Sequence, residues 1–421
     1  MRVNAHGLDI DAICRQARAA ARAIEWLSSQ QRRDVLYAMS EAINAQSSDI
    51  LAANARDVTA GESTGLSPAM LDRLRLDDDR LHAMTAGVRA VADLPDPLHI
   101  DLNERIHANG MRIRRVAVPL GVIAMIYESR PNVTADAGSL CFKAGNAVIL
   151  KGGSEALESN RAILQAMEQG GVSCGMPAHA MQLLDTRDRS VVHDLLQRYD
   201  TIDLVIPRGG EGLIRAVAGH ATMPVLKHYK GICHVYVDVD ADLEMALNIV
   251  ENGKVQRPGV CNATETVLVH ESIADAFLPR LARRLAGYGV ELRGDARTCA
   301  VIPDAIAAHD DDWSAEYLDL ILSIRVVSSA DAAMDHIDHH GSRHSDVIVS
   351  ENAATAQRFL RGVDSAAVYV NASSRFTDGA EFGLGAEIGI STDKVHARGP
   401  CGIESLTSYK YIIEGRGQIR P

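Results

Sequence analysis

Aromatic side chains are scarce in this sequence, and no excess of positive charge accompanies them. Two Trp and five Phe occur in 421 residues, which leaves few platforms on which nucleic-acid bases could stack. Asp and Glu total 55 against 43 Lys and Arg, for a net charge of −12, and the basic residues are scattered along the chain. Such a chain lacks the basic patch that holds a polyanion. We therefore expect no nucleic-acid partner.

Cysteine pairs and long apolar runs are also missing. The cysteines are odd in number and never arranged as C-x-x-C, which indicates neither a disulfide framework nor a zinc ribbon. The apolar stretch 116–127 is interrupted by Pro119 and Gly121 and is too short to span a bilayer. Residues 1–7 have no apolar segment behind their charge, so no signal peptide is expected. We expect a protein of the reducing cytoplasm without a membrane partner. The seven cysteines are Cys14, Cys141, Cys174, Cys233, Cys261, Cys299 and Cys401.

The length and the hydrophobic pattern predict two α/β lobes. A chain of 421 residues exceeds the roughly 250–300 residues at which a single core stops growing. Residues 9–57 have helical spacing, with a second helix expected over 34–54. Asn109-Gly110 predicts a type I′ turn between strands at 102–108 and 111–114. Beyond these, short apolar runs alternate with helical segments, which is typical of parallel sheets. They lie at 122–127, 147–150, 181–184, 204–207, and then at 234–237, 266–269, 324–327, 347–349 and 367–370.

One cysteine, Cys261, has the surroundings of a nucleophile. A lone cysteine is more often a buried, small apolar residue, and the other six keep that interpretation. Cys261 differs because it lies in the polar Pro/Gly loop QRPGVCN, with Lys254 and Arg257 shortly before it. Nearby positive charge and backbone N–H groups stabilise a thiolate.

Two glycine-rich turns follow predicted strands. In Lys151-Gly152-Gly153-Ser154 the lysine leaves the carboxyl end of a strand, where α/β sheets bind ligands, and glycines let backbone N–H groups approach a phosphate. The turn 208–212 (RGGEG) has the same character. Either is also compatible with an ordinary strand-to-helix turn. The segment 383–389 (GLGAEIG) is one residue too long for a dinucleotide fingerprint and has no helical run after it, so we expect a structural loop.

Metal and serine-hydrolase chemistry are not indicated. His336 and His340 share the spacing of zinc ligands, but the Glu of H-E-x-x-H is absent. A solvated, histidine-rich helix end, together with His339 and His344, is the favoured interpretation, and no metal is predicted. No G-x-S-x-G elbow occurs.

Residues 119–154 resemble the cofactor-lobe core of the aldehyde dehydrogenase superfamily, with a proline turn ending in Asn followed by GNAVILK. The chain is more similar to the branch of that superfamily that reduces acyl phosphates. Further matching segments recur in order over about three hundred residues, which is far more specific than any single motif. They are 127–133 (YESRPNV), 206–210 (IPRGG), 256–258 (QRP), 363–373 (VDSAAVYVNAS), 375–379 (RFTDG), 382–387 (FGLGAE) and 396–400 (HARGP).

The resemblance implies an aldehyde-dehydrogenase-like α/β fold with two parallel-sheet lobes and a small β oligomerisation element. The NADPH-binding domain would comprise 1–99 and 115–232, and the catalytic domain 233–400. The oligomerisation element would comprise 100–114 and 401–421. A homo-oligomer is therefore expected, with dimer and tetramer both open. A transient complex with a glutamate 5-kinase is also left open.

The resemblance also assigns residue roles. Cys261 falls at the catalytic nucleophile and Asn132 at the amide of the oxyanion hole. Ser154 replaces a glutamate frequent in NAD-preferring relatives, and its lack of charge suits the 2′-phosphate of NADPH. The implied cofactor contacts are Lys151, Gly152, Ser154, Arg208, Gly209, Gly210 and Glu316. The candidates for the substrate phosphate or α-carboxylate are Arg130, Arg257 and Lys254.

One departure from the superfamily favours reduction. The glutamate that activates water for thioester hydrolysis is replaced by Leu226, and an oxidising dehydrogenase needs that base. The expected activity is NADPH-dependent reduction of L-glutamyl 5-phosphate to L-glutamate 5-semialdehyde and phosphate, in proline biosynthesis. An NAD(P)-dependent semialdehyde or CoA-acylating aldehyde dehydrogenase and a catalytically silent scaffold are the alternatives.

Overall fold

The computed structural model describes residues 8–420, which form two compact units. The first contains 8–227, Gly383–Gly389 and 401–420, and the second contains His228–Phe382 and Ile390–Pro400. The passage into the second unit thus lies a few residues before the predicted 232/233 boundary. In addition, 383–389 packs with the first unit, although the expected catalytic domain included it.

A layer of helices opens the first unit. Asp9 caps α1 by accepting from the Ala12 N–H, and Ser28 and Gln31 form a reciprocal capping box at the start of α2. The single helix expected over 34–54 is wrong, because Gln46 leaves helical geometry (φ −101°, ψ 18°) and separates two helices. α2 packs against α5 and α7. The layer consists of α1 (Ile10–Glu25), α2 (Ser29–Ala45), α3 (Ser47–Ser63), α4 (Pro68–Leu74) and α5 (Asp78–Asp93).

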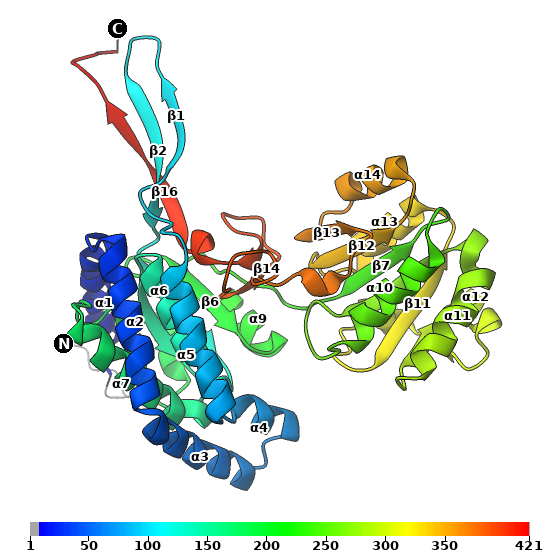
Figure 1. The fold of residues 1–421 in the computed structure, drawn as a ribbon, viewed down its shortest axis with the longest axis horizontal. Helices are drawn as coiled ribbons and strands as arrows, with labels where there is room; N and C mark the ends of the chain where they lie inside the picture. The colour runs from blue at the N-terminus through cyan, green and yellow to red at the C-terminus, as the bar shows by residue number, and fades with distance from the viewer. Residues whose placement is uncertain (1–7, 421) are drawn as a thin grey trace. The chain divides into compact units, whose positions relative to one another are not determined.

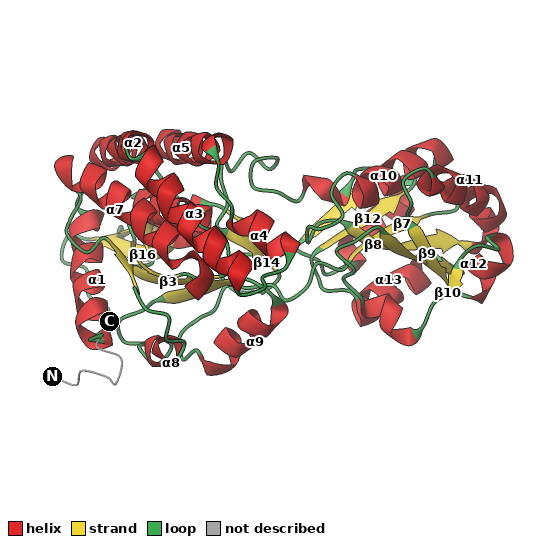
Figure 2. Cartoon of the chain, turned by 90° about the horizontal axis from the view of Figure 1, so that it is seen from below, coloured by secondary structure: helices red, strands yellow, loops and turns green. Residues whose placement is uncertain are grey.

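The sheet of the first unit is parallel and four-stranded, in the order β5-β4-β3-β6. Chain order runs outward from β3 to β5 and then returns to β6, so the direction of winding reverses between β3 and β6. α7 lies on the face covered by α2 and α5, whereas α8 and α9 lie on the other (Figure 2), and α6 packs against α2, α5 and α7. The elements are β3 (Val122–Tyr127), α6 (Asn132–Lys143), β4 (Ala147–Lys151), α7 (Leu157–Ser173), β5 (Met181–Leu183), α8 (Ser190–Leu195), β6 (Leu204–Arg208) and α9 (Glu211–His220).

A separate antiparallel sheet joins β1 (Asp101–Ile106), β2 (Arg112–Pro119) and β16 (Thr407–Glu414). It extends away from the helices of its unit (Figure 1). The predicted hairpin is present, but its type I′ turn is wrong, since only Gly110 (φ 89°) and not Asn109 has positive φ. The Gly110 N–H donates to the His107 carbonyl, and the His107 N–H donates to the Met111 carbonyl. This is a type I turn followed by a left-handed glycine.

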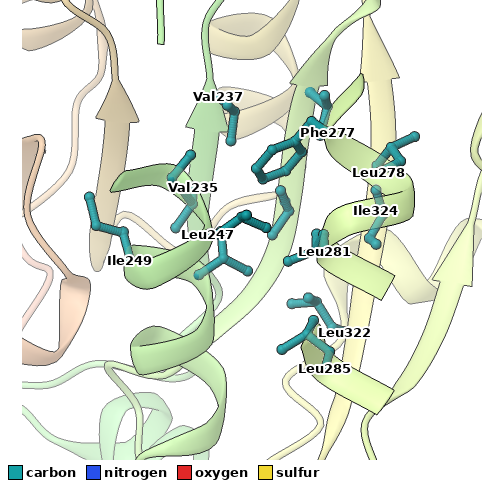
Figure 3. Packing of buried hydrophobic residues seen from close by; sticks show 14 of the residues in the cluster. Val235, Val237, Leu247, Ile249, Phe277, Leu278, Leu281, Leu285, Leu322 and Ile324 are labelled. Carbon is teal, nitrogen blue, oxygen red and sulfur yellow. The ribbon is translucent and has the colours of Figure 1, made fainter. Parts of the chain in front are cut away.

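The second unit contains a seven-stranded parallel sheet in the order β10-β9-β11-β8-β7-β12-β13. α10 and α11 cover one face and α13 the other (Figure 2). Under the first face, Val235, Leu247, Phe277, Leu281 and Ile324 are buried together (Figure 3). The strands are β7 (Cys233–Val237), β8 (Thr264–His270), β9 (Glu291–Gly294), β10 (Ile306–Ala307), β11 (Ile321–Val327), β12 (Ser345–Val349) and β13 (Ala367–Val370). The helices are α10 (Leu243–Val255), α11 (Ala274–Ala286), α12 (Ala296–Val301), α13 (Ala330–His340) and α14 (Ala353–Gly362).

The expected two-lobe parallel α/β fold is confirmed, and every predicted strand of the two sheets is present within a few residues. The short strands β9 and β10 were not predicted, nor was the pair β14 (Gly389–Ser391) and β15 (Gly399–Cys401). Short 3₁₀ segments lie at Ser154–Ala156, Glu271–Ile273, Asp310–Ser314, Ser374–Phe376 and Ile403–Leu406. Within residues 8–420, no helix combines the length and apolarity needed to cross a membrane.

Candidate active site

A cavity of about 570 Å³ lies in the first unit, at the carboxyl ends of β3 and β4. Its walls come from the turns after these strands and from α8 and α9. This is the edge at which open α/β sheets bind nucleotides. Of the predicted cofactor contacts, Lys151, Gly152 and Ser154 line it.

The chemistry of Lys151 and Gly152 suits close approach by a ligand. Lys151 is buried, its Nζ donates to the Gly152 carbonyl at 2.8 Å, and burial lowers the pKa of its ammonium group. A Cβ on Gly152 would overlap the amide of the buried Asn160. Any other residue would therefore push this turn away from its support and into the cavity.

Sequence reasoning missed four charged or ring-bearing side chains of this cavity: Arg187, Arg189, His193 and His220. The two arginines come from the irregular segment between β5 and α8 and are exposed. The histidine rings meet edge to face, with centroids 5.4 Å apart. No motif marks these residues, because they lie in a loop and on separate helices that only the fold brings together.

A carboxylate also belongs to the cavity, one position after Ser154. Glu155 Oε1 accepts from the Ser129 N–H at 2.8 Å and from the Ser129 hydroxyl at 2.6 Å. Burial alone would raise the pKa of Glu155, but the hydrogen bonds from Ser129 outweigh it and lower the pKa. Ser129 has a positive φ of 30°, a strained conformation that is frequent at functional sites. The negative charge is thus held against the turn after β3.

The other predicted phosphate turn has a different environment. Arg208, Gly209 and Gly210 are not among the residues lining this cavity, which α9 joins only from Gly212 onward. The Gly210 N–H donates to Glu128 Oε2 at 2.8 Å, so a carboxylate already satisfies this donor at the start of α9. A cofactor phosphate at 208–210 would have to displace Glu128.

Asn132 is the first residue of α6 and is exposed. Its Nδ2 donates to Asp136 Oδ2 at 2.8 Å, one helical turn later. Burial raises the pKa of the Asp136 carboxyl to about 6, and the Asn132 hydrogen bond opposes that rise. Asp136 therefore orients the amide for which the resemblance implies an oxyanion-hole role.

Cys261 lies in the second unit, in the loop between α10 and β8, and is partly buried. The loop is fastened on both sides of the cysteine. The Cys233 thiol donates to the Cys261 carbonyl at 3.3 Å, and Asn262 Nδ2 donates to the Thr377 carbonyl at 2.9 Å. A Cβ on Gly231 would overlap the Cys261 backbone. The thiol is thus placed by rigid neighbours rather than by a mobile loop.

Positive and ring-nitrogen groups surround Cys261. Burial is the main cause that lowers the pKa of the Arg375 guanidinium, and the charge of Arg257 lowers it further. The electrostatic effect of Cys261 raises this pKa. One ring nitrogen each from His228 and His344 and the Cys261 Sγ lie within 4.8 Å of one another. Sequence reasoning used Arg375 only as part of a matching segment and missed both histidines as neighbours of the thiol.

The remaining predicted site residues occupy several environments. Lys254 is fully buried, and its Nζ donates to Glu265 at 2.6 Å and to the Asp319 carbonyl at 3.0 Å. Contact with a substrate would require this pair to break. Glu316 accepts from the Gly231 N–H at 2.8 Å, which links it to the support of Cys261. Arg130 and Arg257 are exposed.

The prediction of a solvated histidine-rich helix end is wrong for His336 and His344, which are both buried. His336 Nδ1 lies 2.9 Å from Arg325 Nη1, and its ring meets the Trp313 ring edge to face. Burial lowers the pKa of His336 to about 2. α13 turns this side chain inward, so helical spacing alone misjudged its exposure.

Comparison with known proteins agrees with this geometry. A sequence profile of the aldehyde dehydrogenase family matches residues 3–312, more than half of the chain. The gamma-glutamyl phosphate reductase of Moorella thermoacetica is 55% identical over 413 residues, covering 98% of this chain and 99% of that protein. The chain belongs to the aldehyde dehydrogenase family, on its gamma-glutamyl phosphate reductase branch.

Solved structures of related enzymes have the same fold as this chain. The crystal structure of the gamma-glutamyl phosphate reductase of Thermotoga maritima matches with a TM-score of 0.97 and 42% identity, covering 98% of this chain and 100% of that one. An engineered glycolyl-CoA reductase with bound NADP⁺ shares the fold at a TM-score of 0.65 and 16% identity, covering 96% of each chain. The family uses nicotinamide cofactors, and the chain is an oxidoreductase. The resemblance inferred from the sequence is confirmed.

Proposed function

We propose that this chain reduces L-glutamyl 5-phosphate to L-glutamate 5-semialdehyde and phosphate with NADPH, as the second step of proline biosynthesis from glutamate. The observation that carries the proposal is the loop of Cys261, which holds a partly buried thiol close to two histidines and within electrostatic reach of Arg375. Relatives more than half identical over nearly the whole chain support the choice of substrate.

In this mechanism the Cys261 thiolate attacks the acyl carbon, the acyl–phosphate bond breaks, and a thioester remains. The Asn132 amide and the Cys261 N–H stabilise the tetrahedral oxyanion, and one such donor contributes about 3–4 kcal/mol to lowering the barrier. A nicotinamide cofactor, held by the first unit, would supply the hydride that reduces this thioester. The thiol is regenerated when the resulting thiohemiacetal collapses to the aldehyde. Arg130, Arg257 and Arg375 are the proposed anchors for the phosphate and the α-carboxylate.

The first unit is the proposed NADPH-binding domain. Its cavity offers Lys151 for the adenosine ribose, and a backbone at Gly152 that a ligand can approach closely. Ser154 adds no charge, and Glu155 is turned toward Ser129. Arg187 and Arg189, which also line the cavity, match the two negative charges of a 2′-phosphate. These features favour NADPH over NADH.

Leu226 supports reduction over oxidation. Its side chain is buried, at the position where the superfamily places the water-activating glutamate. A thioester on Cys261 would therefore persist until hydride arrives, because no carboxylate at this position generates hydroxide.

The reverse reaction tests the proposal directly. Purified protein is given glutamate 5-semialdehyde and NADP⁺, with inorganic phosphate, with CoA, or with neither, and NADPH absorbance is followed. NADPH formation that requires phosphate supports an acyl-phosphate reductase. Formation that requires CoA instead identifies a CoA-acylating dehydrogenase, and equal formation without either acceptor identifies a hydrolytic one.

Two variants assign the nucleophile. Cys261→Ser should abolish turnover while NADPH still quenches or shifts the protein fluorescence as in the parent. Cys174→Ser is the matched control, because Cys174 is an exposed thiol of the first unit. Retained turnover in Cys261→Ser would refute the assignment.

The three-stranded sheet is the proposed oligomerisation element. Tyr409, Tyr411 and Ile413 alternate along β16 on one face and are each about half exposed. Apolar side chains in such an arrangement favour a partner surface. We place the protein in the cytoplasm, where its reduced cysteines are stable. Sedimentation of the parent and of Ile413→Asp would measure the contribution of this face to self-association.

A further inference from the structure

Three side chains of the second unit converge on one point. The Cys261 Sγ, one ring nitrogen of His228 and one of His344 all lie within 4.8 Å of one another. His228 comes from the segment before β7, Cys261 from the loop after α10, and His344 directly precedes β12. His344 is buried and the other two are partly buried. Cysteine sulfur and imidazole nitrogen are the ligand types that zinc takes most often in proteins, and imidazole also suits copper and nickel.

The tautomer of His228 suits a metal ligand. Its Nδ1 lies 2.8 Å from the Ile390 carbonyl oxygen, which can only accept a hydrogen bond, so Nδ1 carries the proton. The neutral ring then has its lone pair on Nε2. A ligating histidine usually donates its other N–H to a carbonyl or carboxylate in this way, which fixes the orientation of the ring.

The surroundings of His344 provide a second, independent observation. Its Nδ1 lies 2.9 Å from Ser345 Oγ, which in turn lies 2.6 Å from Thr377 Oγ1. Its Nε2 is buried and has no hydrogen-bond partner among residues 8–420. An unsatisfied buried polar atom costs free energy, and such an atom calls for a partner. A bound cation beside Cys261 would supply it.

We propose that His228, Cys261 and His344 bind a thiophilic divalent cation of the zinc class, which reversibly blocks the reactive thiol. Zinc bonds of about 2.0–2.3 Å in a tetrahedral site bring neighbouring ligand atoms to about 3.3–3.7 Å. The three side chains would close by about 1 Å around the ion, and water would complete the coordination. On binding, the Cys261 thiol releases its proton to solvent and the sulfur donates to the metal.

This is a site for metal taken up from solution rather than for an ion that the reaction uses. A zinc-bound thiolate is a much weaker nucleophile than a free one, and the ion occupies the space beside the sulfur that an acyl carbon would need, so occupancy opposes acylation. This inhibitory consequence rests on the proposed function of Cys261. The binding itself does not.

Cobalt(II) serves as the probe, because a thiolate ligand produces a charge-transfer band in the near ultraviolet. The full chain is treated with a chelator, titrated with Co²⁺, and then with Zn²⁺ as a competitor. We expect one ion per chain, the band, and its loss on zinc addition. Cys261→Ser should remove the band. His228→Gln and His344→Gln should each weaken binding at least about tenfold, since even outer-shell changes cost that much.

Two controls make the result specific. Cys174→Ser removes an exposed thiol, and His82→Gln removes an exposed imidazole on α5; both should bind as the parent does. Because His344 is buried, its replacement also tests folding, so the partly buried His228 provides the second variant. Absence of the band in the parent would overturn the proposal. So would His228→Gln and Cys261→Ser variants that bind Co²⁺ as tightly as the parent does.

Activity separates this site from the proposed function. Zinc should inhibit turnover in the parent and protect Cys261 from iodoacetamide. Adding a chelator should reverse both effects. If cobalt binds through the thiolate while Cys261→Ser keeps full turnover, the metal site stands and the nucleophile assignment fails. If Cys261→Ser is inactive but no cobalt band appears in the parent, the nucleophile assignment stands and the metal site fails.

Discussion

Replacing Lys254 by methionine should destabilise the second unit by about 3–5 kcal/mol, the usual cost of removing one partner of a buried ion pair. Both side chains of the Lys254–Glu265 pair are 0% exposed, with the charged atoms 2.6 Å apart. Methionine fills a similar volume, so the loss reports the unpaired, buried Glu265 carboxyl group rather than a cavity. Glu265 would keep only the Leu318 N–H, at 3.3 Å.

The pH dependence of this variant has a definite sign. Burial raises the pKa of Glu265 to about 7, and Lys254 opposes the rise, so without Lys254 the pKa must lie higher still. A carboxyl with a raised folded-state pKa is protonated in the folded chain while ionised in the unfolded one. Stability should therefore fall by up to about 1.4 kcal/mol per pH unit as the pH rises from about 5 through 7.

The chain offers its own reporter for this measurement. Of the two tryptophans, Trp313 is buried in the second unit and Trp26 is 88% exposed in the first. In a Trp26→Phe background, urea unfolding followed by fluorescence reports the second unit. We expect Lys254→Met to lower the midpoint by roughly 1–2 M, given the usual slopes.

The double variant Lys254→Met/Glu265→Gln removes both charges and should recover most of the loss, with a flat pH profile. It should also keep substantial reductase activity, because a buried pair does not contact substrate. An unchanged midpoint in Lys254→Met would refute the stability argument. A folded double variant without activity would instead show that Lys254 acts on the substrate, as the sequence predicts.

Three further changes probe the site itself. Arg189→Ala should raise the KM for NADPH about tenfold or more and leave that for NADH nearly unchanged, and an equal effect on both would remove Arg189 from 2′-phosphate recognition. Asn132→Ala should lower kcat by about 10²–10³, as expected for one oxyanion donor, with NADPH affinity intact by fluorescence titration. Gly231→Ala should displace the Cys261 backbone and lower kcat by roughly 10², without changing cofactor binding in the first unit; normal turnover would show that this contact is not needed.

The sequence contains enough pattern to predict the sheets and to single out Cys261 as the candidate nucleophile. The strands 122–127 and 367–370 coincide with β3 and β13, because each apolar run is bounded by turn residues and pairs in a parallel sheet. Cys261 was singled out because its polar loop differs from the apolar surroundings of the other cysteines. Lys151, Gly152 and Ser154 follow from the chemistry of a strand end.

Most of the features that could not be predicted are contacts between residues that lie far apart in the sequence. Lys254 attracted a substrate role because its charge precedes Cys261 by seven positions, but α10 directs it inward to Glu265. His344 looked like part of a solvated helix end, yet it directly precedes β12, which lies between β7 and β13 in the sheet, and it is buried. Arg187 and Arg189 carry no motif, since a loop can present a charge at many spacings. The sequence Asn109-Gly110 favours a type I′ turn but does not require it. In the structure only Gly110 has positive φ, so the turn is of type I.

The pairing of β2 with β16 has a consequence for synthesis of the chain. β2 ends at Pro119, and its second partner begins only at Thr407. While a ribosome translates the intervening residues, one edge of β2 presents unpaired backbone groups, which invite association with other strands. The first unit reaches its final hydrogen-bonded state only after β16 has emerged, so a truncated or stalled product retains this open edge and is prone to aggregate.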